Sequence, residues 1–231
     1  VGSEMCIRDS YKILPAGTYT FDADSWTIPS GELNATAAIK IDLNKIEELG
    51  SLYDDYVLPL RITSSTGEPM GQNKYTKVLA HIGFKNDYSG TYSGKGIITQ
   101  QGTTYTTEIT STQLYAINND ICYMFVGEKT RANTPDYLNY VVEIKRDEWG
   151  GITLSSEVGS LEFKSYNSKL SRKYTYNYND QRYYTEITTV ELAYEYLDKT
   201  QSEDLRMTFE GSFSMSRDVL RVEYPNVDVE E

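Results

Sequence analysis

The segment from Leu205 to Met215, LRMTFEGSFSM, decides the fold class of this chain. Every second position in it is apolar or glycine, and the positions between are Arg, Thr, Glu or Ser. This period of two indicates a strand with one buried face and one solvated face, which is typical of antiparallel sheets. Gly211 interrupts the apolar positions and predicts a bend or a bulge at that point of the strand.

The same period recurs outward from this segment, at residues 190–196 (VELAYEY) and 140–145 (YVVEIK). Turn residues separate such segments at short intervals, for example at 118–120 (NND) and 179–180 (ND). This spacing favours an antiparallel meander. Only residues 43–49 (LNKIEEL) are typical of a helix, with Asp42 or Asn44 available as its cap.

Length and charge exclude several classes of protein. The chain has 231 residues, enough for one large or two modest domains. It carries 34 acidic and 22 basic side chains, for a net charge of -12. Because such a chain repels phosphate groups and anionic lipid, we expect no nucleic acid partner. No apolar run reaches the length of a membrane span.

Three phrases near the start carry a family resemblance: residues 14–21 (LPAGTYTF), 28–31 (IPSG) and 56–64 (YVLPLRITS). Together they resemble the Ig-like N-terminal domain, known as domain of unknown function family 1735, of surface lipoproteins from polysaccharide-degrading Bacteroidota. The resemblance covers residues 11–85. It implies the C-terminal part of an Ig-like β-sandwich.

Residues 1–10, VGSEMCIRDS, form a segment of a different kind. Back-translated, they reproduce the transposase adaptor of sequencing libraries, so we expect an artefact that is not a domain. Cys6 lies in this stretch, and excluding it leaves Cys122 with no partner for an intrachain disulfide. On this interpretation the gene continues upstream of residue 11, and the sandwich lacks its first strands.

Residues 86–231 resemble the partner domain that follows this Ig-like module in the same family, domain of unknown function family 4361. Residues 88–96 (YSGTYSGKG) and 209–217 (FEGSFSMSR) carry the resemblance. It implies a lipocalin-like, antiparallel up-and-down β-barrel with a short C-terminal tail. The strand count suits a barrel, and a second β-sandwich stays open as the alternative. The sequence therefore predicts an all-β protein of two domains.

The resemblance also implies a function. It points to a non-catalytic outer-membrane lipoprotein at the cell surface that binds or scaffolds polysaccharide in a utilisation system. Its partners would be an oligo- or polysaccharide and other outer-membrane glycan-uptake proteins, with a lipid anchor outside this sequence as the membrane contact. Two alternatives stay open: a structural spacer or adhesion module, and the accessory region of a larger glycoside hydrolase.

The sequence contains no recognisable catalytic constellation. His81 is the only histidine, so we interpret it as structural and expect no zinc site. Carboxylates do occur in pairs, as a glycosidase requires, but these pairs fall in predicted turns where solvation is the ordinary state. We expect no enzyme activity, no cofactor and no metal, although Asp22 and Asp24 leave calcium open. The pairs are Asp22 and Asp24, Asp54 and Asp55, and Asp147 and Glu148.

Tyrosine is the one marked excess, with 21 residues against 6 Phe and 2 Trp. Its ring offers a flat apolar face and its hydroxyl a polar rim, a combination used at recognition surfaces, but tyrosine is also a strong strand former. Residues outside the regular alternation are therefore the better candidates for glycan contact: Trp149, Tyr137, Tyr183 and Tyr184. Adjacent strand residues face opposite sides, so one of Tyr183 and Tyr184 should be exposed.

Overall fold

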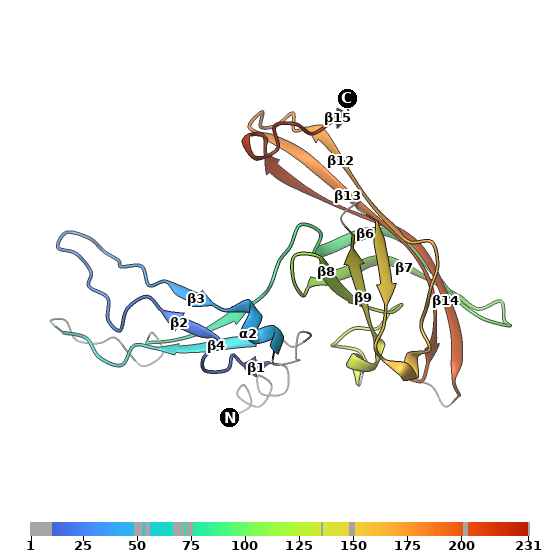
Figure 1. Cartoon of the computed structure of the whole chain (residues 1–231), viewed down its shortest axis with the longest axis horizontal. Helices are drawn as coiled ribbons and strands as arrows, with labels where there is room; N and C mark the ends of the chain where they lie inside the picture. The colour runs from blue at the N-terminus through green and yellow to red at the C-terminus, as the bar shows by residue number, and fades with distance from the viewer. Residues whose placement is uncertain are drawn as a thin grey trace. The chain divides into compact units, whose positions relative to one another are not determined.

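The structure is a computed structural model that describes residues 11–48, 53, 56–66, 72, 76–134, 136–147, 151–200 and 203–230. The expected artefact, residues 1–10, lies outside the described residues. The chain divides between Gly83 and Phe84 into two compact units. Figure 1 colours them from blue at the first residues to red at the last. No helix in the described ranges is long and apolar enough to cross a membrane.

In its described residues, the first unit contains two small sheets and one helix. β1 (Lys12–Ile13), β4 (Tyr56–Arg61) and β5 (Lys77–Ile82) form one sheet, in which β1 runs parallel to β4. β2 (Tyr19–Phe21) and β3 (Ile39–Ile41) form the other sheet. The predicted helix is confirmed as α2 (Leu43–Glu48), and the backbone N–H of Lys45 donates to Oδ1 of its cap, Asp42, over 3.4 Å.

The second unit is built on one sheet of ten strands. Its strands are β6 (Gly90–Gln100), β7 (Thr106–Ala116), β8 (Ile121–Phe125), β9 (Val141–Arg146), β10 (Ile152–Ser155), β11 (Lys164–Ser165), β12 (Lys169–Tyr176), β13 (Tyr183–Asp198), β14 (Leu205–Leu220) and β15 (Val229–Glu230). The order is β10-β9-β8-β7-β6-β14-β13-β12-β15, with β11 on β13. Three short 3-10 helices, η2 (Tyr137–Tyr140), η3 (Gly159–Leu161) and η4 (Arg221–Glu223), lie between strands.

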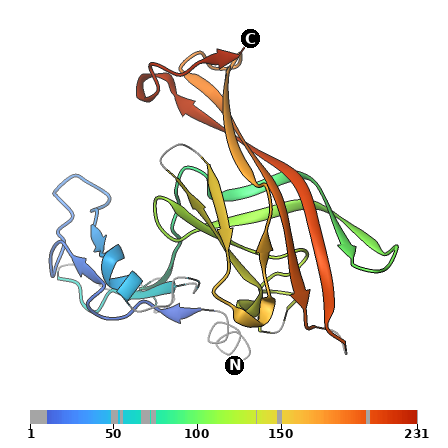
Figure 2. The same cartoon turned by 45° about the vertical axis from the view of Figure 1, so that its right-hand side comes forward.

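The prediction of an all-β fold is confirmed, but the barrel does not close by a continuous ladder. The sheet curls until Gly151 forms a single antiparallel bridge with Lys169 of β12. β10 has only four residues and cannot pair along an eight-residue β12, whose free edge also binds β15. The sandwich alternative is not observed, because the strands form one continuous path. Figures 1 and 2 show β12, β13 and β14 running on past the other strands as an arm. The arm is the part of β13 before Thr189 and of β14 after Ser214, where the pairing of β14 with β6 ends, together with the paired residues of β12 and the loops at that end.

The alternation in β14 has the predicted burial pattern, with Met207, Phe209 and Phe213 buried. The predicted bulge at Gly211 is wrong, because β14 pairs with β13 without a shift from Leu205 to Leu220. Glycine is needed there for space: a Cβ at Gly211 would lie 2.6 Å from the Phe213 ring. The register shift of this region lies in β6.

Candidate functional site

A groove of about 350 Å³ runs along β7 in the second unit. β7 pairs with β6 over most of its length, but among the described residues its pairing with β8 is limited to Tyr115 and Ala116. The chain leaves β8 after Phe125, so residues 127–130 form the opposite wall of the groove. A strand edge therefore faces a loop, and backbone and side-chain polar groups line the space between them.

The loop wall is fixed by contacts to the end of β13. The ammonium of Lys129 pairs with the carboxylate of Asp198 at 2.7 Å and donates to the hydroxyl of Thr200 at 2.9 Å. The N–H of Gly127 donates to the Tyr194 hydroxyl at 3.0 Å. Gly127 has a φ of 56°, and a Cβ there would lie 2.5 Å from the Tyr196 hydroxyl, so glycine is required. The buried core thus positions this loop.

One end of the groove is aromatic. Tyr115 and Phe125 line it, and Tyr115 stacks on Tyr123 with ring centroids 4.9 Å apart. Tyr137, a residue predicted from the sequence, meets Phe125 edge-on at 5.6 Å. Tyr123 and Phe125 are buried, whereas Tyr115 and Tyr137 are half-buried and present part of their rings. Burial raises the pKa of the Tyr115 hydroxyl, which therefore stays protonated and can donate a hydrogen bond.

Arg131 holds this aromatic cluster together. Its guanidinium lies 5.4 Å from the centroid of Tyr115 and 5.7 Å from that of Tyr137, and it donates a hydrogen bond to the Tyr123 hydroxyl. A guanidinium over several aromatic faces gains cation–π attraction at each face. The rings at this end of the groove are therefore held in place before any ligand arrives.

The rest of the groove is lined by short polar side chains, including Thr91, Thr110, Thr112, Gln113 and Thr130. Two carboxylates, Glu108 and Glu128, also line it, and Glu108 forms an ion pair with Lys95 at 2.8 Å. The described lining contains no histidine and no cysteine. Hydroxyls and an amide beside a flat aromatic end can hydrogen-bond a polyhydroxylated ligand and cover its apolar face.

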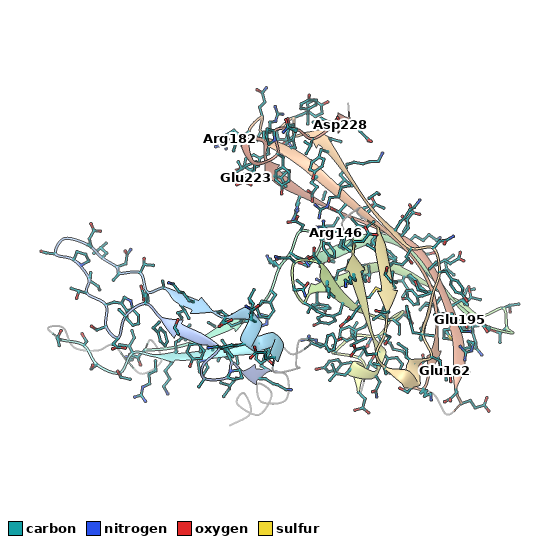
Figure 3. The ribbon with its side chains drawn as sticks, viewed as in Figure 1. Arg146, Glu162, Arg182, Glu195, Glu223 and Asp228 are labelled. Atoms are coloured by element: carbon teal, nitrogen blue, oxygen red, sulfur yellow. The ribbon has the colours of Figure 1, made fainter. Side chains whose placement is uncertain are left out.

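The structure separates Tyr183 and Tyr184 from Tyr137. Both lie at the start of β13, on the arm, where Figure 3 labels the neighbouring Arg182. The Arg182 guanidinium lies 5.7 Å from the centroid of the Tyr183 ring, and that of Arg221 lies 4.8 Å from the centroid of the Tyr184 ring. Both tyrosines are half-buried, because the guanidinium of an arginine lies over each ring. The prediction that one of them is exposed is therefore wrong.

Trp149, the remaining predicted contact, lies outside the described residues. Sequence reasoning missed Tyr115 and Phe125. Phe125 belongs to the apolar run ICYMF around Cys122, which is typical of a buried strand, and nothing local shows that this strand ends at a groove. The partial signal for Tyr115 was its position just before the turn at residues 118–120.

Of the carboxylate pairs singled out in the sequence, Asp54, Asp55 and Glu148 lie outside the described residues. No group of three or more His, Cys, Asp or Glu side chains suited to a metal occurs within the described ranges. Asp22 instead organises its own loop, since its Oδ1 accepts hydrogen bonds from Trp26 Nε1 at 3.0 Å and from Ala38 N at 3.2 Å. Asp147 accepts a hydrogen bond from the N–H of Gly151 at 2.7 Å.

Solved structures with the same fold come from Bacteroides. A multidomain protein including DUF1735 from Bacteroides ovatus aligns with a TM-score of 0.75 and 17% identity, over 94% of this chain and 74% of that chain. A protein of unknown function from the same species reaches 0.76 and 20%, over 90% and 71%. An auxiliary nutrient binding protein from Bacteroides thetaiotaomicron reaches 0.75 and 17%, over 92% and 72%.

Comparison of the sequence with protein families identifies the family of this chain. No curated protein matches the chain. A family model described as a C-terminal domain matches residues 76–214, and a companion model described as an N-terminal domain matches residues 7–69. The C-terminal match alone spans more than half of the chain, and the chain belongs to the family that this pair of N-terminal and C-terminal domain models defines.

Proposed function

We propose that this chain is a non-catalytic glycan-binding component of the bacterial cell surface, and that the groove along β7 holds the saccharide. The observation that carries the proposal is the combination of a fixed aromatic end, Tyr115 and Phe125, with a lining of hydroxyl and amide groups. A sugar ring needs both, an aromatic face for its C–H side and hydrogen-bond partners for its hydroxyls. Loops and edges on a rigid β scaffold are common places for binding residues.

The similar solved structures support the class of function. One of them is described as an auxiliary nutrient binding protein, and it comes from Bacteroides thetaiotaomicron. We extend this to a Bacteroidota surface lipoprotein of a polysaccharide-utilisation system, which works beside other outer-membrane glycan-uptake proteins. In this proposal the first unit is part of an Ig-like module and the second a lipocalin-like binding domain.

Binding without catalysis fits the charges of the groove. Hydrolysis of a glycosidic bond uses two carboxyl groups on opposite sides of the scissile bond. The groove has two carboxylates, Glu108 on β7 and Glu128 on the loop wall, and both side chains are exposed. Glu108 also forms an ion pair with Lys95. Neither carboxylate has the apolar surroundings that make a general acid.

Gel retardation tests the proposal on the whole chain. The probes are xyloglucan, galactomannan, arabinoxylan, mixed-linkage β-glucan and pectin, each cast into a native gel. We expect at least one to retard the protein, Tyr115→Ala to restore free migration, and Tyr178→Ala to behave as the wild type. Tyr178 is 85% exposed and lies on the arm, away from the groove. No retardation by any probe, or equal retardation of Tyr115→Ala, would count against the groove.

A second candidate function follows from the free edge of β7. A strand edge that faces a loop can accept a strand from another protein, which gains main-chain hydrogen bonds along the edge. This observation favours the spacer or adhesion alternative. Retardation that fails for every polysaccharide, together with capture of purified outer-membrane proteins that Thr110→Pro abolishes, would favour this second function, because proline removes a backbone donor from β7.

A further inference from the structure

A second hollow in the same unit has no role in the proposed function. It has a volume of about 310 Å³ and lies where η2, η3 and the end of β13 meet. It shares no lining residue with the groove along β7. Its size lies at the lower end of small-molecule pockets, which is the range for one or two sugar rings.

The lining combines an apolar floor with a polar rim. Tyr140, Leu161 and Leu197 are buried and form the apolar part. Asn139, Ser160 and Thr200 are exposed and supply an amide and two hydroxyls. The Asn139 amide and the Ser160 hydroxyl can each donate and accept hydrogen bonds, which is what the hydroxyls of a sugar require. The Thr200 hydroxyl already donates to Asp198 at 2.6 Å and keeps only acceptor capacity.

The backbone at two edges of the hollow is strained. Asp136, immediately before η2, has a φ of 53°, and Glu162, immediately after η3, has a φ of 46°. Within the described residues these are the only non-glycine positions with positive φ. Such conformations cost free energy and concentrate at ligand clamps. Asp136 lines the hollow, and Glu162 directly follows the lining residue Leu161.

The charges around the hollow select against anionic ligands. Three carboxylates, Asp198, Asp204 and Asp136, act on the Tyr140 hydroxyl and add to the effect of burial in raising its pKa. Two of them are paired, Asp198 with Lys129 at 2.7 Å and Asp204 with Lys199 at 3.7 Å. The surplus is therefore negative, and the whole chain carries a net charge of -12. A uronate or a sulfated sugar would be repelled.

We infer that the hollow between η2 and η3 is a second saccharide-binding site, specific for neutral sugar rings and independent of the groove along β7. Its amide and hydroxyl rim would bind the ring hydroxyls, while Leu161, Leu197 and the edge of Tyr140 cover the apolar face. Lys129, which lines the groove, donates a hydrogen bond to Thr200, which lines the hollow, so the two sites are neighbours and one glycan chain or two can occupy them.

Amide chemical shifts of the 15N-labelled full chain test the inference. The probes are cellotetraose, xylotetraose, mannotetraose and chitotetraose, with tetragalacturonate as the charged comparison, each up to roughly 10 mM to reach millimolar affinities. We expect at least one neutral probe to shift the amides of Asn139, Ser160 and Thr200. These shifts should persist in Tyr115→Ala, which removes the aromatic end of the groove.

Variants decide whether the shifts report binding. Asn139→Ala should weaken the affinity measured at the hollow by about tenfold, the cost of one good hydrogen bond, with an unchanged melting temperature. Asn179→Ala, a matched exposed asparagine on the arm, should change neither. The inference is overturned by three results: no shift at the hollow with any neutral probe, equal shifts with tetragalacturonate, or an affinity that Asn139→Ala leaves intact. Loss of the hollow shifts in Tyr115→Ala would show that the site is not independent.

Discussion

The two halves of β13 follow one alternation but bury different chemistry. In the half that lies in the curled sheet, the inward positions are Val190, Leu192, Tyr194 and Tyr196, all buried in the apolar core. In the half that forms the arm, the inward positions include Thr188 and Glu186, which are equally buried. The alternation therefore determines which side chains point inward in both halves. The residues opposite on the neighbouring strands determine whether the buried face is apolar or polar.

The cross-strand partners explain the difference. Tyr194 lies opposite Phe209, and the two rings stack with centroids 4.7 Å apart. Glu186 lies opposite Arg217 on one side and Tyr174 on the other, and it accepts hydrogen bonds from both, at 2.9 Å and 3.0 Å. In the curled sheet, apolar partners stabilise β13 through burial. In the arm, charged partners stabilise it through directed hydrogen bonds.

The largest expected loss of stability is in the half of β13 that lies in the curled sheet. Tyr194→Ala removes a ring that is 1% exposed, its stacking on Phe209 and the hydrogen bond that holds Gly127. We expect a loss of about 3–5 kcal/mol in the free energy of unfolding, measured by urea denaturation. Tyr178→Ala, on an 85% exposed side chain, should cost less than about 0.5 kcal/mol. Comparable losses for the two variants would break the contrast between core and surface tyrosines.

The next effect is on the arm. Glu186→Gln leaves Arg217 beside a neutral amide, and since the Arg217 side chain is 32% exposed, water compensates in part. We expect a loss of about 2–3 kcal/mol, below that of a fully buried pair. Replacing both residues by methionine should recover at least half of the loss, because Arg217 is then not left beside a neutral group. A double variant no better than the single one would show that the ion pair is not the relevant interaction.

A pH titration sharpens the comparison at the far end of β13. Hydrogen bonds from Lys164 at 2.8 Å and Tyr166 at 2.6 Å lower the pKa of Glu195 from 4.5 to about 2. Figure 3 labels this residue near Glu162. Because the pKa is lower in the folded chain, this contribution to stability is fully present above pH 4.5 and is lost as the pH falls towards 2.

Glu195→Gln should therefore be less stable than the wild type at pH 6, and the difference should narrow below pH 4.5. Denaturation midpoints across this range measure it. Glu191→Gln is the matched control on the same strand, where the carboxylate is 46% exposed beside Lys169, and it should show only a small difference at each pH. A Glu195→Gln deficit that does not change with pH would contradict the assignment.

Much of the fold could be predicted from the sequence because alternation is a local signal. The strands at Leu205–Leu220 and Tyr183–Asp198 and the helix at Leu43–Glu48 all follow patterns within a few residues. The open edge of the sheet could not be predicted, since closure depends on the length of β10 against that of β12. The role of Gly211 was also misread, because the rings that need its space lie on its own strand and its neighbour β6 carries a facing glycine.

The candidate site was less accessible to prediction, because distant residues build it. The loop wall of the groove depends on Gly127 meeting Tyr194, 67 residues away, and on Lys129 meeting Asp198. Tyr137 was predicted and lies in the aromatic cluster, whereas Tyr183 and Tyr184 belong to the arm. Selecting tyrosines outside the alternation finds candidates both at the groove and on the arm. It does not show which of these tyrosines lie together.

The central claim is tested most directly by calorimetry. The polysaccharide that retards the protein in the gel is titrated into three forms of the whole 231-residue chain. The proteins are the wild type, Tyr115→Ala in the groove and Tyr184→Ala on the arm, with melting temperatures measured beside each titration. We predict that Tyr115→Ala loses at least tenfold in affinity, about 1.4 kcal/mol, while Tyr184→Ala binds as the wild type does. Wild-type affinity in Tyr115→Ala together with lost affinity in Tyr184→Ala would contradict the account and move the site to the arm.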